Sequence, residues 1–121
     1  MAKQHILVVE DDLGIRESLV EVLEGEGFII IAARDGFEAL EKLKQQPILP
    51  CWILLDIMMP RMNGKDCLAA IRSNPEWENI PITFLSAAGR IEDISIMHKV
   101  DFLNKPIDLD VLLASSKLHC C

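Results

Sequence analysis

The feature that most constrains the fold is the stretch Cys51–Asp56, an unbroken apolar run that ends in an acidic residue. Apolar residues without polar alternation are typical of a strand buried on both faces, at the centre of a parallel sheet. Pro60 and Gly64 follow soon afterwards and turn the chain out of the sheet. Ligands of open α/β sheets bind outside the carboxyl ends of the strands, so Asp56 is a candidate site residue as well as a candidate turn cap.

Size and charge limit the classes of protein that this chain can belong to. Its 121 residues, half of them hydrophobic, suit one core, and we predict a single domain over residues 1–121. No apolar run approaches the roughly 20 residues of a membrane span, and the N-terminus lacks the apolar core of a signal peptide. We therefore expect a cytoplasmic protein without membrane insertion. The net charge of −7 disfavours direct binding of nucleic acid, whose phosphates it repels.

The four cysteines have no spacing that is typical of a metal site. Cys51 and Cys67 lie in apolar stretches, where free thiols behave as small hydrophobic groups. Cys120 and Cys121 end the chain, and we interpret them as part of a frayed tail. The cysteines thus predict free thiols, as is usual in the cytosol.

Short apolar runs alternate with amphipathic segments along the whole chain. Residues 6–9, 28–33, 51–56, 80–85 and 102–103 are predicted strands, and about 13–24, 35–45, 64–73, 91–99 and from 108 onward are predicted helices. Strand–helix alternation of this kind indicates an α/β fold with a parallel sheet covered by helices on both faces. No glycine-rich phosphate-binding loop follows the first strand, which disfavours a dinucleotide or nucleoside triphosphate site.

Three consecutive acids, Glu10, Asp11 and Asp12, follow the first predicted strand. Adjacent carboxylates repel one another unless they are solvated, point apart or share a cation. One of them would suffice to cap the following helix, so capping alone does not account for three. Oxygen ligands of this kind suit a hard divalent cation such as Mg²⁺.

The other notable polar residues also lie where predicted strands end. Asp56 ends the third strand, Ser86 the fourth and Lys105 the fifth, as Asp11 and Asp12 follow the first. Because the carboxyl ends of parallel strands share one edge, we expect these groups to meet. Carboxylates, a hydroxyl and an ammonium around a divalent cation are suited to phosphoryl transfer, with a carboxylate as the nucleophile.

In these motifs the chain resembles the receiver domain of two-component response regulators, over essentially its whole length. The resemblance implies a three-layer, doubly wound (βα)5 fold of the flavodoxin-like type, with the strand order 2-1-3-4-5. The matching segments are Val8–Asp12, Leu54–Pro60, Asn63–Gly64, Leu85–Ala87 and Phe102–Pro106.

The resemblance also implies a phosphoacceptor and a metal site. Asp56 would take a phosphoryl group from a phosphohistidine on a sensor histidine kinase or a histidine phosphotransfer protein. The cofactor would be Mg²⁺ (or Mn²⁺), bound directly by Asp12 and mostly through water by Asp11. Asp56 and the backbone carbonyl of Met58 would complete the protein ligands.

Three further positions carry the family's switch roles. Lys105 would pair with one phosphoryl oxygen, and Ser86 would hydrogen-bond another. Phe102 stands at the switch position and would turn inward when Ser86 moves. The Lys105–Pro106 peptide bond is cis in this family.

The chain departs from the family pattern near its last strand. The interval from Ser86 to Lys105 is a few residues shorter than is typical, and the shortfall lies in the weakly patterned helix 91–99. Val100 and Asp101 replace the usual Gly-Ala, and Phe102 replaces the more common Tyr. Without the phenolic hydroxyl we expect a more buried ring. These changes lie on the surface through which such domains meet their partners.

We therefore expect a signalling module that phosphorylates itself, turns over no external substrate and acts on an effector protein or domain. An aspartyl-phosphate phosphatase with Asp56 as nucleophile is one alternative, although such enzymes usually need an acid two residues on, where this chain has Met58. A flavodoxin-like binder of FMN is disfavoured because a phosphate needs donors rather than carboxylates. A receiver-like binding module that works without phosphorylation is the third alternative.

Overall fold

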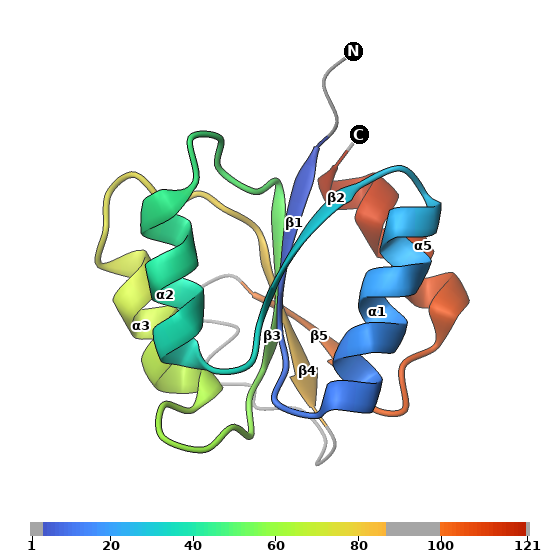
Figure 1. The fold of residues 1–121 in the computed structure, drawn as a ribbon, viewed down its shortest axis with the longest axis horizontal. Helices are drawn as coiled ribbons and strands as arrows, with labels where there is room; N and C mark the ends of the chain where they lie inside the picture. The colour runs from blue at the N-terminus through green and yellow to red at the C-terminus, as the bar shows by residue number, and fades with distance from the viewer. Residues whose placement is uncertain (1–3, 87–99, 121) are drawn as a thin grey trace.

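The computed structural model describes residues 4–86 and 100–120, and in them a central parallel sheet lies between two layers of helices (Figure 1). The sheet has five strands in the order β2-β1-β3-β4-β5. This order is that of the flavodoxin-like doubly wound folds, so the predicted fold class is confirmed. The strands are β1 (His5–Val9), β2 (Ile29–Ala33), β3 (Trp52–Asp56), β4 (Ile82–Ser86) and β5 (Asp101–Asn104). The helices are α1 (Leu13–Gly25), α2 (Gly36–Gln45), α3 (Gly64–Arg72) and α5 (Leu109–His119).

Strand β3 is the middle of the sheet, as its sequence predicts. It pairs in parallel with β1 on one side and β4 on the other, and all five of its residues are buried. The register aligns Val9 with Leu55, so Glu10 follows β1 at the level at which Asp56 ends β3. Ser86 is aligned with Asn104, which places Lys105 directly after the end of β5. The pairing therefore carries the polar strand ends to one edge.

Each face of the sheet has its own apolar cluster. Figure 1 shows α2 and α3 covering one face and α1 and α5 covering the other. Phe84 and Leu55 belong to the cluster under α2 and α3, whereas Trp52 and Leu54 belong to the one under α1 and α5. Alternate residues of β3 thus point to opposite faces, and burial on both sides explains why its sequence shows no polar alternation.

The helices begin at side chains that accept hydrogen bonds from their first turns. Asp12 caps α1, Asp35 caps α2, Asn63 caps α3 and Asp108 caps α5, each accepting from a backbone N–H two or three residues on. Such caps satisfy N–H groups that have no partner within the helix. Glu38 also reaches back past the start of α2, where its Oε1 accepts from the backbone N–H of Arg34 at 3.0 Å.

The expectation of free thiols is wrong for Cys51 and Cys120, and that of a frayed C-terminal tail is wrong for Cys120. α5 continues to His119, and Cys120, which is 6% exposed, packs into the cluster under α1 and α5. Its sulfur forms a disulfide with Cys51. The helix brings together two cysteines that lie far apart in the sequence. Cys67 is a free, buried thiol, as predicted.

Some expectations fall on residues that the structure leaves undescribed. The predicted helix over 91–99, with its shortened connection, lies outside the described residues, as does Cys121. None of the helices within 4–86 and 100–120 has both the length and the apolar character that crossing a membrane requires.

Gly64, the first residue of α3, packs closely against the backbone of Asp56 and Ile57. A Cβ at this position would lie 2.6 Å from the backbone oxygen of Asp56 and 2.7 Å from Cα of Ile57. We expect Gly64→Ala to destabilise the protein by about 1–3 kcal/mol, because backbone atoms must move. Urea unfolding followed by tryptophan fluorescence measures this change.

Gly25→Ala is the matched control. An added Cβ at Gly25, the last residue of α1, meets nothing within 4 Å. Alanine is the better helix former, so this variant should be as stable as the wild type or gain up to about 1 kcal/mol. Equal destabilisation of both variants would contradict the proposed steric cause.

Candidate functional site

The site is built around Asp56, the last residue of β3. Its side chain is nearly inaccessible, and the residue is 2% exposed. Oδ1 accepts a hydrogen bond from the backbone N–H of Met58 at 3.2 Å and lies 3.3 Å from Nζ of Lys105. A carboxylate at the carboxyl end of a central strand occupies the position at which such folds bind ligands.

Two more carboxylates meet Asp56 at this edge of the sheet. One oxygen each from Glu10, Asp11 and Asp56 lies within 4.8 Å of the others. Glu10 is fully buried, and its backbone N–H donates to the oxygen of Ala33 at 3.0 Å, extending the pairing of β1 with β2. Asp11 is exposed. The group therefore has a buried floor and one side open to solvent.

Lys105 supplies the cation of the site. Its Nζ lies 2.6 Å from Oε1 of Glu10, closer than to Asp56. Its backbone N–H donates to the carbonyl of Ser86 at 2.8 Å, and the following peptide bond to Pro106 is cis, as the family resemblance implies. Ser86 is 4% exposed at the end of β4. The predicted residues Asp11, Asp56, Ser86 and Lys105 are thus gathered at one edge.

The structure corrects the expected place of Asp12. It is Glu10, not Asp12, that joins Asp11 and Asp56. Asp12 is exposed, and its Oδ1 accepts from the backbone N–H of Ile15 at 2.9 Å as the cap of α1. The sequence contained a signal for this, because a helix expected from Leu13 needs its N-cap at residue 12.

The loop behind Asp56 is fixed to the start of α2. Arg61, whose φ of 68° is unusual for a residue other than glycine, places its Nη2 2.9 Å from Oδ2 of Asp35. Its guanidinium also lies over the ring of Phe37, 5.5 Å from the centroid. These contacts hold the loop that presents the backbone of Met58 beside Asp56. The Met58 side chain points outward and is 72% exposed.

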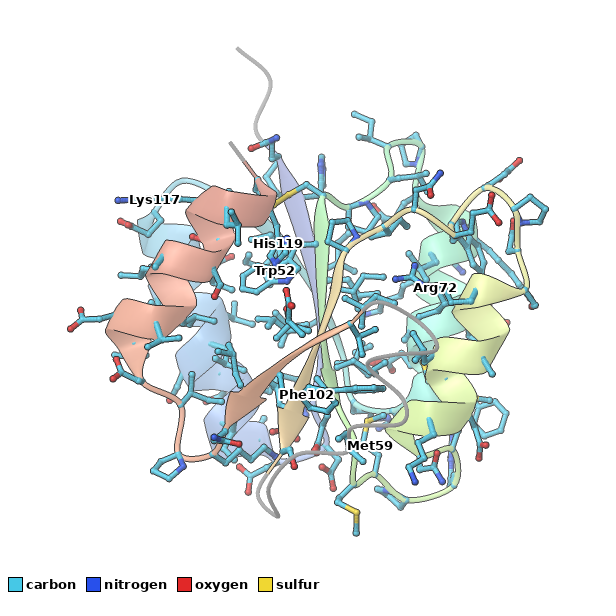
Figure 2. The ribbon with its side chains drawn as sticks, turned by 180° about the vertical axis from the view of Figure 1, so that it is seen from behind. Trp52, Met59, Arg72, Phe102, Lys117 and His119 are labelled. Carbon is cyan, nitrogen blue, oxygen red and sulfur yellow. A yellow bond between two sulfur atoms is a disulfide. The ribbon has the colours of Figure 1, made fainter. Side chains whose placement is uncertain are left out.

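Phe102 lies on β5, beside Phe84 of the neighbouring strand β4. Its ring centroid is 5.7 Å from that of Phe84, and the half-buried ring packs against the cluster under α2 and α3. Figure 2 shows the side chain directed from β5 toward the face of the sheet that α3 covers. The ring is therefore packed inward in this structure.

The sequence matches the model of a known protein family. The family model described as "Response regulator receiver domain" matches residues 6–117. This chain belongs to the response regulator receiver domain family. Within the family, PilG of Pseudomonas aeruginosa is 32% identical over 117 residues, which are 94% of this chain and 85% of PilG.

Other similar proteins place this receiver domain among CheY-like proteins of varied length. The chemotaxis protein CheY4 of Vibrio cholerae has a structure with a TM-score of 0.88 and 26% identity, covering 98% of this chain and 99% of that one. A homolog of the transcriptional regulatory protein CpxR from Haemophilus influenzae is 38% identical over 117 residues, 93% of this chain. The match covers 48% of that relative, so the receiver domain spans about half its length.

The electrostatics of the receiver site favour an added cation. Burial, hydrogen bonding to Glu10 and Asp11 and the charge of Glu10 raise the pKa of Asp56 to about 8, and Lys105 only partly opposes this. Burial by itself would lower the pKa of Lys105, but its hydrogen bond to Glu10 and the nearby carboxylates raise it. Ionising all three carboxylates beside one ammonium would leave an excess of negative charge, and their oxygens are ligands that Mg²⁺ prefers.

Removing the charge of Asp56 should stabilise the metal-free protein. Because the pKa of Asp56 is raised from 3.8 to about 8, the folded protein loses stability as the pH rises through this interval. Asn does not ionise, so Asp56→Asn should gain on the order of 2 kcal/mol at pH 7.5 and much less at pH 5. Urea unfolding with a chelator present at both pH values measures the difference.

Asp110→Asn is the control for this effect. Asp110 is an exposed acid in the first turn of α5, outside the site. Its substitution should change the free energy of unfolding by less than about 0.5 kcal/mol at either pH. A stability gain for Asp56→Asn that is the same at pH 5 and pH 7.5 would show that charge is not its cause.

Proposed function

We propose that this receiver domain accepts a phosphoryl group on Asp56 in a Mg²⁺-dependent reaction and switches its surface in response. The observation that carries the proposal is the meeting of Asp56 with Lys105 and two further carboxylates at one edge of the sheet. A buried carboxylate with an ammonium 3.3 Å away is a nucleophile placed beside a group that can neutralise phosphoryl oxygens.

The transfer itself needs few protein groups. An oxygen of the Asp56 carboxylate attacks the phosphorus of a phosphohistidine, the P–N bond breaks, and the imidazole leaves with the electron pair of that bond. The product is an acyl phosphate on Asp56. Lys105 has three N–H donors, and its Nζ already lies 3.3 Å from Oδ1 of Asp56. It can therefore donate hydrogen bonds to the phosphoryl oxygens and neutralise the charge that develops on them. The protein contributes mainly position and charge.

We propose that Glu10, Asp11, Asp56 and the backbone carbonyl of Met58 hold the cofactor, Mg²⁺ (or Mn²⁺). When bound, this cation offsets the repulsion among the carboxylates and stabilises the charge that develops on the phosphoryl oxygens. Glu10 also orients Lys105, whose Nζ it approaches to 2.6 Å. The contacts of Arg61 with Asp35 and Phe37 keep the loop that carries Met58 in position.

The proposed switch uses Ser86, Lys105 and Phe102. A phosphoryl group adds about −1.5 to −2 charge and new acceptor oxygens, which the hydroxyl of Ser86 and the ammonium of Lys105 can bind. It shifts the balance of two arrangements only by as much as it binds them differently. Phe102 packs on Phe84, two residues before Ser86, so a shift of β4 reaches the ring through direct contact.

The proposal extends to partners and setting. A sensor histidine kinase or a histidine phosphotransfer protein would donate the phosphoryl group, in the cytoplasm, and an effector protein or domain would read the switch. The transcriptional regulatory relative, about twice as long as the match, is consistent with receivers that act through a second domain. We propose that residues 1–121 act as one receiver domain without direct contact to nucleic acid and without turnover of external substrate.

The proposed phosphorylation can be tested with acetyl phosphate. Incubated with acetyl phosphate and Mg²⁺, the wild type should gain one phosphoryl group, and at least tenfold less should form with a chelator. Asp56→Asn should gain none, because the amide is not a nucleophile. Intact-protein mass spectrometry measures the label, which should be lost in base and kept in acid.

Other outcomes would favour other functions. Continuous release of phosphate from unrelated phosphomonoesters would support an aspartyl-phosphate phosphatase. A wild-type protein that stays unlabelled in the presence of Mg²⁺ would contradict the proposal and favour a binding module that does not depend on phosphorylation.

The assignment of the metal ligands has its own test. Glu10→Gln should weaken Mg²⁺ binding about tenfold or more, because it removes one buried carboxylate from the group. Asp12→Asn should leave the affinity within twofold, since Asn caps a helix as well as Asp does. Isothermal titration calorimetry measures both affinities. The reverse order of effects would restore Asp12 as the ligand.

A further inference from the structure

A second feature lies at the other end of the sheet from Asp56. Cys51 directly precedes β3, whose last residue is Asp56, and Cys120 caps the end of α5. The two residues are 69 positions apart in the sequence, yet their Cα atoms lie 5.6 Å apart and their sulfurs are bonded. Figure 2 shows this bond beside the C-terminal end of α5. Their separation is within the range that a disulfide spans without movement of the backbone.

The surroundings of both cysteines also suit the free thiols. Sγ of Cys51 lies 3.3 Å from the carbonyl oxygen of His5, which also accepts the backbone N–H of Cys51 at 2.8 Å. After reduction, the thiol can donate to this same oxygen. Cys120 is buried among apolar side chains, where a thiol packs as a small hydrophobic group. Both sulfurs therefore have suitable surroundings as free thiols as well as in the disulfide.

The bond ties down the last turn of α5. His119 places Nε2 3.2 Å from Oδ2 of Asp101 on β5, and its ring lies 5.3 Å from the ring of Trp52 on β3. Figure 2 shows His119 and Trp52 side by side between α5 and the sheet. The Asp101 side chain is 64% exposed, so this contact is weak. The disulfide is the covalent member of this set of contacts between α5 and the sheet.

We propose that Cys51 and Cys120 form a reversible disulfide through which the thiol state of the surroundings controls how firmly α5 is held. The thiolate of one cysteine attacks a small-molecule disulfide, R–S–S–R, and releases one thiol. The second thiolate then displaces the other R–S⁻ from the mixed disulfide. In total the two cysteines lose two electrons and two protons, and R–S–S–R becomes two R–SH. Excess R–SH drives the same steps backward.

The location separates this control from the phosphorylation chemistry. Cys51 lies just before β3, and Asp56 is the last residue of that strand. Both sulfurs of the disulfide belong to the apolar cluster under α1 and α5. Oxidation should therefore change the stability of α5 and leave the reactivity of Asp56 unchanged. Disulfides do not persist in a reducing cytosol unless an oxidant appears. Formation of the Cys51–Cys120 bond would therefore signal oxidising conditions.

The test equilibrates the full chain in mixtures of reduced and oxidised glutathione and traps free thiols with a maleimide. Peptide mass spectrometry then identifies the bonded pair. The Cys51–Cys120 bond should form in the wild type and in Cys121→Ser, should be absent from Cys51→Ser and Cys120→Ser, and should be lost again in millimolar reduced glutathione. A bond mainly between Cys120 and Cys121, a bond between chains, or a Cys51–Cys120 bond that resists reduction would overturn the proposal.

Thermal unfolding and labelling give the second readout. The oxidised wild type should melt roughly 10 °C above the reduced form, and Cys51→Ser should show no such difference. Equal melting temperatures of oxidised and reduced wild type would overturn the proposed hold on α5. The rate of labelling by acetyl phosphate should agree within twofold between the two forms, and a larger change would overturn the separation from Asp56. Failure of both forms to label would reject the proposed phosphorylation and leave the redox result standing.

Discussion

The ion pairs of Lys105 with Glu10 and Asp56 are the interaction on which the geometry of the site depends. Buried carboxylates are costly unless a cation and hydrogen bonds compensate them. Here the cation comes from the end of β5 and the carboxylates from the ends of β1 and β3, so the pairs exist only when the parallel sheet is complete. One ammonium does not balance three carboxylates, and the site therefore favours a further cation.

The two ends of the sheet carry different features, a group of carboxylates at one end and a disulfide at the other. At the carboxyl ends, burial raises the pKa of Asp56 and so lowers the stability of the metal-free protein. At the opposite end, the disulfide of Cys51 with Cys120 fastens α5 to the start of β3. The same central strand connects both ends, with its side chains packed on both faces. The proposed phosphorylation at Asp56 and the proposed redox control of α5 therefore lie at opposite ends of β3.

Most of the fold was predictable because its signals are local. Unbroken apolar runs indicated the strands, amphipathic segments indicated the helices, and the alternation of the two indicated the parallel sheet. The site was predictable as a set of strand ends. The sequence did not show that Glu10 rather than Asp12 would lie beside Asp11 and Asp56, since both are acids within three positions and only the start of α1 distinguishes them.

The sequence by itself determined which chemical groups close the strands, and hence that Asp56, Ser86 and Lys105 meet, because carboxyl ends of parallel strands share an edge. The tertiary structure decided which oxygen each group faces. It buried Glu10 against Lys105 and brought Cys120 to Cys51. These outcomes depend on side-chain direction and on the packing of distant segments, and no local pattern in the chain encodes either.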